Sequence, residues 1–236
     1  MNITTTVGQR LRKRLPGNPA LRLWHEPSYC GMAVQTASGP LIENYLETTH
    51  RVLSLALDAH SKILAVPVLL CYPKTMPPGK LLPNNLAISR FLYLLNWEMD
   101  LINTAHAPDM RDLWCREQVT SDKPHYHALL FFNGNALQRL GSLNAFSKGS
   151  IEAYGSDCLY HRIVRAWAWA IGWPLEQMQG LVDVAADTIT DELYVYHFHR
   201  DDHNAIQQVF YAASYMCKAY SKPIGDGVHC FEGSRR

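Results

Sequence analysis

Apolar and polar positions alternate along this chain of 236 residues with two kinds of spacing, and each spacing predicts one kind of element. Apolar residues that recur every three or four positions predict amphipathic helices, and short apolar runs bounded by turn residues predict strands. The expected helices cover residues 41–61, 84–105, 135–141, 157–171 and 204–219. The expected strands cover residues 63–72, 112–119, 125–132 and 193–199.

The order of these elements favours an α+β fold. The strands at 112–119 and 125–132 are joined by a tight turn at 121–124, which predicts an antiparallel hairpin. Pro67 lies in the strand at 63–72 and has no backbone N–H, so it predicts an edge position or a bulge. We therefore expect a central antiparallel sheet with helices on a face.

The composition is that of a globular protein, with 47% hydrophobic and 18% charged residues. Proline and glycine punctuate residues 1–40, for which we expect an irregular N-terminal arm, followed by one domain over residues 41–236. The arm carries Arg10, Arg12, Lys13, Arg14 and Arg22. We expect these residues to be solvated, with a DNA-tracking arm as the alternative. The net charge of +1 supports a nucleic-acid partner only weakly, because a local patch decides binding.

Neither cysteine spacing nor hydropathy indicates an extracellular or a membrane protein. The six cysteines include no C-x-x-C pair, so a zinc knuckle is not indicated. The most apolar stretch, residues 63–71, falls well short of the roughly 18 residues that a membrane span needs. The first residues show no secretory signal pattern. We therefore expect a cytoplasmic protein with reduced cysteines and no membrane partner.

Two histidines on the second strand of the hairpin form a candidate metal site. His125 and His127 are two residues apart, so both imidazoles project from one face of the strand. Glu117, on the partner strand, could supply a carboxylate. Such ligands with open positions suit Mg²⁺ or Mn²⁺, and zinc also remains open. The alternative is a chance pair of partly solvated histidines, since His197 and His199 repeat the same spacing.

Two tyrosines near the end of the chain are candidate nucleophiles. Tyr211 and Tyr215 are four residues apart in an expected helix, with Lys218 three residues further on and Lys222 one turn beyond. Residues at this spacing share one face of a helix, so both phenols and the ammonium would point the same way. A tyrosine can form covalent intermediates and could attack a phosphodiester. The alternative is ordinary packing of the helix on the sheet.

Together, the two motifs resemble those of the HUH endonucleases. The resemblance rests on His125-Tyr126-His127 followed far downstream by Tyr211-Ala212-Ala213-Ser214-Tyr215-Met216-Cys217-Lys218. The order, histidines before tyrosines, resembles that of the replication-initiator branch. The wider stretches at 113–118, 125–133 and 214–219 are similar to those of the inovirus (filamentous phage) replication-protein family. The resemblance covers about residues 60–222.

This resemblance implies both a fold and an activity. The fold would be a central antiparallel sheet carrying the histidine strand, flanked by helices that include the tyrosine helix. The activity would be metal-dependent nicking and joining of single-stranded DNA at an origin, initiating rolling-circle replication of a phage, prophage or plasmid. Tyr215 would be the principal nucleophile, leaving a 5′-phosphotyrosine and a free 3′-OH. Tyr211 would be the second nucleophile, and Lys218 would orient the phosphate or offset charge. Partners in the bacterial cytoplasm would be single-stranded or origin DNA, a host helicase and a polymerase.

Two other functions remain open. A transposase of the same superfamily would use Tyr215 alone, with Tyr211 as packing, and a regulator on the same fold would bind DNA without cutting it. The chain has no Gly-x-x-x-x-Gly-Lys-Ser/Thr motif and therefore no P-loop helicase of its own. Trp167 and Trp169, on the helix at 157–171, are expected in the core, with base stacking as the alternative.

Overall fold

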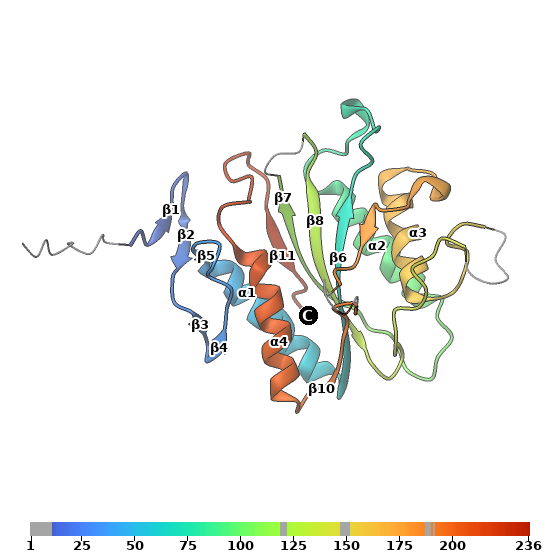
Figure 1. Ribbon diagram of the computed structural model, residues 1–236, viewed down its shortest axis with the longest axis horizontal. Helices are drawn as coiled ribbons and strands as arrows, with labels where there is room; N and C mark the ends of the chain where they lie inside the picture. Colours follow the sequence, from blue (N-terminus) through green and yellow to red (C-terminus); the bar gives the residue numbers. More distant parts are fainter. Residues whose placement is uncertain (1–10, 119–121, 147–151, 187–189, 191) are drawn as a thin grey trace, which may run out of the picture.

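An antiparallel sheet forms the centre of the protein in the computed structural model, which describes residues 11–118, 122–146, 152–186, 190 and 192–236 (Figure 1). The strands follow the order β10-β6-β8-β7-β11. Strand β10 pairs with the first half of β6, and β9 pairs with β6 near its C-terminal end. They are β6 (Lys62–Cys71), β7 (Arg111–Glu117), β8 (His125–Asn133), β9 (Val182–Asp183), β10 (Tyr196–His199) and β11 (Phe231–Gly233). The predicted hairpin is confirmed, because β7 and β8 are antiparallel neighbours. Part of the turn expected at 121–124 lies outside the described residues.

Four α-helices in the described part of the chain cover the two faces of this sheet (Figure 1). Helices α1 (Glu43–Ala59) and α4 (His203–Ser214) pack on one face, and α2 (Leu86–Asp100) and α3 (Leu159–Ile171) pack on the other. Short 3₁₀ helices are η1 (Pro78–Lys80), η2 (Leu175–Gln177) and η3 (Tyr215–Cys217). The fold is therefore α+β, with the antiparallel sheet between two helical layers.

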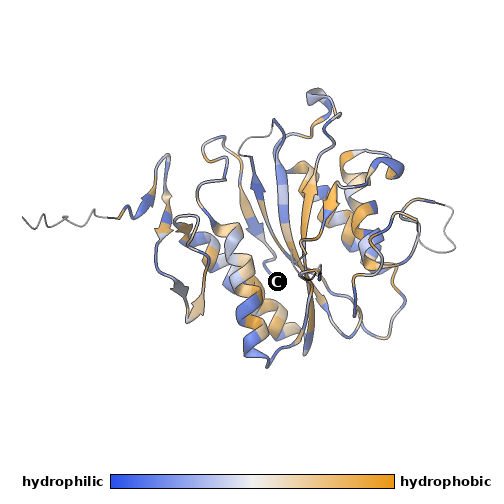
Figure 2. Cartoon of the chain, viewed as in Figure 1, coloured by the Kyte–Doolittle hydropathy of each residue, from blue (hydrophilic) through white to orange (hydrophobic). Residues whose placement is uncertain are grey.

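Side-chain alternation assigns each strand residue to one of the two faces. Even-numbered residues of β8, such as Leu130, belong to the core under α2 and α3, and odd-numbered ones, such as Phe131, belong to the core under α1 and α4. Because both faces are buried, β6 is a nearly continuous apolar run (Figure 2). His125 and His127 share the odd parity of Phe131 and therefore face the layer that contains α4.

Pro67 lies in β6 at a point where one side of the strand has no partner. On the side away from β8, β10 pairs with residues 62–65 and β9 pairs with residues 69–70. Residues 66–68 pair with neither strand, so on this side the missing N–H of Pro67 removes no ladder hydrogen bond. The predicted edge position is confirmed only locally, because β6 as a whole is an interior strand.

Short strands occupy much of the N-terminal segment, so the expectation that residues 1–40 are irregular is wrong for the part that the structure describes. These strands are β1 (Arg14–Leu15), β2 (Asn18–Trp24), β3 (Ser28–Tyr29), β4 (Met32–Ala33) and β5 (Leu41–Ile42). Strands β1, β2 and β5 form one small sheet, and β3 pairs with β4. Glycine marks a turn here, since Gly17 adopts a φ of 85° between β1 and β2. The ring of Tyr29 stacks on that of Phe210, 6.4 Å away, so the segment packs against α4.

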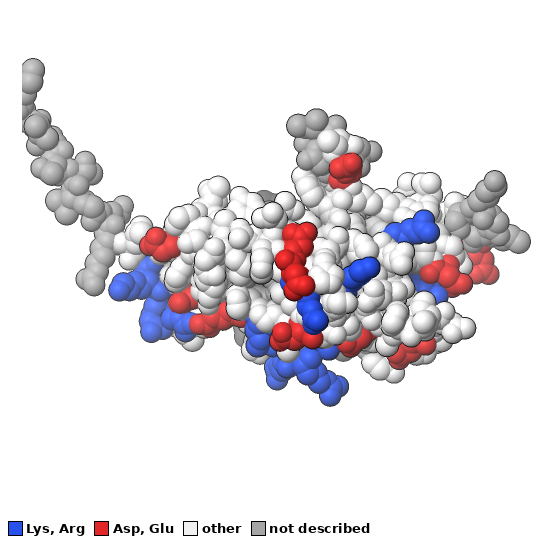
Figure 3. Space-filling view, turned by 90° about the horizontal axis from the view of Figure 1, so that it is seen from below, with Lys and Arg blue, Asp and Glu red and all other residues white. Residues whose placement is uncertain are grey.

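The basic residues of this segment do not form one uninterrupted basic surface. Arg22 pairs with Glu43 at 2.6 Å and with Glu47 at 2.5 Å, both on α1. Arg10 lies outside the described residues. On the face drawn in Figure 3, acidic and basic side chains are interspersed. The expectation of a solvated basic cluster is therefore wrong for Arg22, which is partly buried in an ion-pair network.

Tertiary hydrogen bonds replace the short helix that the sequence predicts at 135–141, and no helix forms there. The N–H of Gly134 donates to Lys62 O at 2.8 Å, and Leu140 O accepts from the N–H of Tyr160 at 2.9 Å. Between these points, local bonds from the N–H groups of Ala136 and Leu137 to Asn133 O form a single turn, which is not continued into a helix. The other expected helices are present, although α2 ends at Asp100, before the predicted end near 105.

The two tryptophans of α3 lie in different surroundings. Trp167 is fully buried, and its Nε1 donates to Cys71 O at 2.9 Å. Trp169 is 43% exposed and packs edge-on against Trp97 of α2. The expectation of core packing is confirmed for Trp167 and is wrong for Trp169. All six cysteines are free thiols. Among the described residues, no helix has both the length and the apolar character to cross a membrane.

Candidate metal centre and tyrosine pocket

Strand pairing brings one carboxylate and two imidazoles together on the α4 side of the sheet. Glu117, at the end of β7, lies directly opposite His125, at the start of β8. The Nε2 atoms of His125 and His127 lie 3.8 and 3.6 Å from Glu117 Oε2. One ligand atom from each of the three residues lies within 4.8 Å of the other two. We call these three residues the triad.

The triad fits a single divalent cation. Ligand atoms about 2.1 Å from a shared ion lie roughly 3.0–3.4 Å from one another. The observed histidine-to-Glu117 separations are 3.6 and 3.8 Å and the third pair lies within 4.8 Å, so the ligand atoms would contract around an ion. Burial lowers the pKa of His127 to about 4, although the carboxylate of Glu117 opposes this change. His127 is therefore neutral near pH 7, and a lone pair is available for a metal.

The second histidine pair, His197 and His199, is not buried and has no carboxylate on the described strand opposite it. His197 and His199 are both exposed at the end of β10, and His199 pairs with Asp201 at 3.2 Å. The expectation of partly solvated strand histidines is confirmed for this pair. The same spacing therefore has different consequences on β8 and β10, because only β8 has a carboxylate opposite its histidines among the described residues.

Two lysines, Lys218 and Lys222, offset the charge of Glu117 inside the protein. Lys222 Nζ donates to Glu117 Oε1 at 2.7 Å, and Lys218 Nζ lies 3.2 Å from Oε2. None of the three side chains is more than 4% exposed. Burial alone would raise the pKa of Glu117, but the His125 imidazole and the Lys222 ammonium hold that pKa well below its usual range. Glu117 is therefore an ionised, buried carboxylate.

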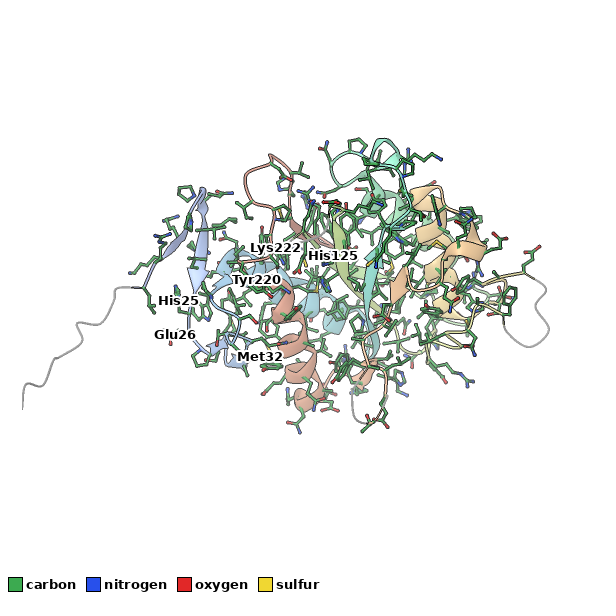
Figure 4. The ribbon with its side chains drawn as sticks, turned by 45° about the horizontal axis from the view of Figure 1, so that its top comes forward. His25, Glu26, Met32, His125, Tyr220 and Lys222 are labelled. Atoms are coloured by element: carbon green, nitrogen blue, oxygen red, sulfur yellow. The ribbon has the colours of Figure 1, made fainter. Side chains whose placement is uncertain are left out.

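The two oxygens of this carboxylate have different neighbours. Oε1 contacts Lys222, whereas Oε2 faces both imidazoles and Lys218. A cation held by the triad would therefore share Oε2 with the Lys218 ammonium. Figure 4 shows Lys222 close to His125, and Tyr220 near the end of α4. The contact between Lys222 and Glu117 is absent from the sequence prediction, which places this lysine one turn beyond Lys218, where the tyrosine helix ends.

Tyr215 lies against both His127 of the triad and Lys218. Its ring centroid is 6.0 Å from that of His127, with the ring planes at 76°. Lys218 Nζ lies 3.3 Å from the centre of the Tyr215 ring, which is a cation–π contact. Tyr211 lies one turn earlier on α4 and is 46% exposed. The structure therefore brings Tyr215, Lys218 and the triad together.

The helix that carries the tyrosines is shorter than predicted, because α4 ends at Ser214 and not near residue 219. The carbonyl of Tyr211 accepts hydrogen bonds from Ser214 Oγ at 2.6 Å and from Gln35 Nε2 at 2.9 Å. The N–H of Tyr215 bonds instead to later carbonyls, which begins the tighter 3₁₀ turn η3. Gln35 lies far away in the sequence, so no local signal predicts this ending.

Lys218 follows the helix and does not belong to it. It has an extended conformation and forms an isolated bridge with Leu41 of β5. The prediction that Tyr211, Tyr215 and Lys218 share one face of a helix is therefore wrong, because Lys218 lies outside the helix. Lys218 nevertheless reaches the Tyr215 ring, because the chain turns back toward the sheet after η3.

A pocket of about 680 Å³ opens beside the triad. Residues of α4, η3, β6 and β8 line it, together with Gln35, Asp183, Ala185, Tyr194 and Tyr196. His127, Tyr211 and Tyr215 all contribute to its wall. A ligand in this pocket would therefore touch one member of the triad and both tyrosines.

The fold and the site define an α+β protein with a three-residue cluster that could hold a metal ion beside two tyrosines. The chain belongs to the family described as the YagK/YfjJ C-terminal domain, which matches residues 25–234. A curated relative is the uncharacterized protein YfjJ of Escherichia coli (strain K12), which is 28% identical over 127 residues. The match covers 53% of this chain and 55% of the relative, so the chain spans about half the length of the curated relative it matches. No solved structure matches the chain.

Proposed function

We propose that the protein is an HUH-type endonuclease, similar to inovirus replication proteins, that nicks and joins single-stranded DNA in rolling-circle replication of a phage, prophage or plasmid. The observation that carries the proposal is the placement of Tyr215 against His127 of the triad, with ring centroids 6.0 Å apart. A potential covalent nucleophile and a potential metal centre thus share one side of the sheet. If the two motifs had arisen by chance, there would be no reason for His127 and Tyr215, about 90 residues apart in the sequence, to lie in contact.

The proposed reaction is a transesterification. A divalent ion, Mg²⁺ or Mn²⁺, bound by Glu117, His125 and His127 would polarise a phosphoryl oxygen of the DNA. The Tyr215 phenol oxygen forms a bond to phosphorus, the bond from phosphorus to the 3′ oxygen breaks, and the phenol proton ends on the released 3′-OH. The product is a 5′-phosphotyrosine, whose ester bond conserves the energy needed for joining. Lys218 orients the phosphate beside Tyr215.

Tyr211 is the second nucleophile of the proposed cycle. Both tyrosines line one pocket with His127, which supports successive attack at one phosphate-binding centre. In the second round the Tyr211 oxygen bonds to phosphorus at the regenerated site as the bond from phosphorus to the 3′ oxygen breaks. The 3′-OH released there attacks the phosphotyrosine of Tyr215, which frees the Tyr215 phenol and closes a circle. If Tyr211→Phe leaves the rates of nicking and joining unchanged, the single-tyrosine transposase scheme replaces this one.

The test is the formation of a covalent adduct with DNA. The protein is incubated with a pool of labelled single-stranded oligonucleotides of random sequence and Mn²⁺, and adducts are separated under denaturing conditions. We expect an adduct from the parent and at least a hundredfold less from Tyr215→Phe, because the phenylalanine has no attacking oxygen. Tyr93→Phe is a matched control, since Tyr93 is 73% exposed on α2, on the opposite side of the sheet.

Two results would refute the proposal. One is an equal yield of adduct from the parent and from Tyr215→Phe. The other is the absence of any adduct from the parent with either Mg²⁺ or Mn²⁺ while the oligonucleotides still bind. The second result would favour the DNA-binding regulator.

A further inference from the structure

The pocket beside the triad has a chemistry that differs from that of the triad. Its wall consists mostly of aliphatic side chains and the four tyrosines Tyr194, Tyr196, Tyr211 and Tyr215. Among the described lining residues there is no lysine or arginine, and Asp183 is the only one with a formal charge at pH 7. Such a wall attracts flat, uncharged, aromatic groups and gives no counter-charge to a phosphate.

The cations of this region lie outside the pocket wall. Lys218 and Lys222 gather around Glu117, and neither lines the pocket. His127 and Tyr215 belong to both regions, so the neutral pocket continues directly from the charged centre. This division matches the two parts of a nucleotide, whose phosphate is anionic and whose base is neutral and aromatic.

We propose that this pocket binds an unpaired base of single-stranded DNA, next to the phosphate held at the triad. The inference rests on the proposed function and adds a determinant of base preference to it. The volume of about 680 Å³ lies within the range of roughly 300–1,000 Å³ that is usual for pockets that bury small organic ligands. Tyrosine rings provide the stacking surfaces, and stacking tolerates every base because each has a π face.

Asp183 is the residue that makes the pocket selective. It is exposed on β9, and its carboxylate can only accept hydrogen bonds. The exposed amino groups of cytosine and adenine donate to such an acceptor, whereas the single N3–H donor of thymine lies between two carbonyl oxygens that a carboxylate repels. Gln208 of α4 also lines the pocket and can both donate and accept. We therefore expect cytosine or adenine to be preferred over thymine at this position.

The test compares binding of three labelled oligonucleotides of about 15 nucleotides, a length within the range of single-strand binding sites. These are oligo(dC), oligo(dT) and an abasic chain of the same length, each titrated with the parent in Mg²⁺ and followed by fluorescence anisotropy. We expect oligo(dC) to bind about tenfold more tightly than the abasic chain and several-fold more tightly than oligo(dT). Equal affinities for all three would overturn the inference.

Variants of the pocket show whether the preference arises there. Asp183→Asn should remove the difference between oligo(dC) and oligo(dT), because an amide can also donate. Tyr194→Ala should weaken oligo(dC) binding about tenfold and leave the abasic chain unaffected. Tyr93→Ala, on the opposite side of the sheet, should change none of these affinities. Unchanged melting temperatures would establish that the variants are folded, and a uniform loss for all three oligonucleotides in the pocket variants would contradict the inference.

Failure of this inference can be told apart from failure of the proposed function. A parent that forms the Tyr215 adduct but binds all three oligonucleotides equally is a nuclease without this base pocket. A parent that shows the Asp183-dependent preference but forms no adduct has the pocket without the cutting activity.

Discussion

Replacing Lys222 by methionine tests whether Glu117 is an ionised carboxylate buried between two ammonium groups. Methionine keeps an unbranched, largely apolar side chain of similar size, and it removes the ammonium group with its charge and its hydrogen bond to Glu117. Lys222 is fully buried, and its Nζ lies 2.7 Å from Glu117 Oε1. After the substitution, Glu117 keeps one ammonium neighbour, Lys218, at 3.2 Å from its other oxygen.

The size of the effect follows from this remaining contact. Removing one partner of a buried ion pair costs about 3–5 kcal/mol, because the other charge stays buried without compensation. Since Lys218 still offsets part of the charge, we expect a loss at the lower end, about 3 kcal/mol. The double variant Lys222→Met/Glu117→Gln removes both charges, so it should be less destabilised than the single Lys222→Met variant.

The assay is urea unfolding of the metal-free protein at pH 7, followed by tryptophan fluorescence. Lys80→Met is the control, because Lys80 is exposed on η1, and it should change the free energy of unfolding by less than about 0.5 kcal/mol. The reasoning is refuted if Lys222→Met costs less than about 1 kcal/mol, or if the double variant is no more stable than the single one.

Two further predictions concern the triad and the end of α4. Calorimetric titration with Mn²⁺ should give binding heat for the parent and for His197→Ala/His199→Ala, but none for His125→Ala/His127→Ala; equal isotherms would speak against the triad. Ser214→Ala should reduce stability by about 1–3 kcal/mol, because the Ser214 hydroxyl accepts from a backbone N–H in the interior. It should also slow nicking while the Mn²⁺ isotherm stays unchanged, and a parallel loss of both would contradict a positioning role.

The sequence predicts the triad because its geometry depends on local rules. The spacing of His125 and His127 fixes a common strand face, and the short connection after β7 fixes antiparallel pairing. Together these rules place Glu117 on the strand beside the histidines, and the structure adds the register that sets it opposite His125. The helices at 43–59 and 159–171 are predictable for the same reason, since their apolar periodicity is contained within each segment.

Only the tertiary structure determines how the tyrosines meet this triad. The sequence pattern continues the helix to about residue 219, but Gln35 and Ser214 take the carbonyl of Tyr211, and α4 ends at Ser214. The position of Lys222 likewise depends on the buried charge of Glu117, which lies 105 residues earlier. Periodicity cannot report such contacts, because it records which face of an element is apolar and not which distant group supplies a hydrogen bond or an opposite charge.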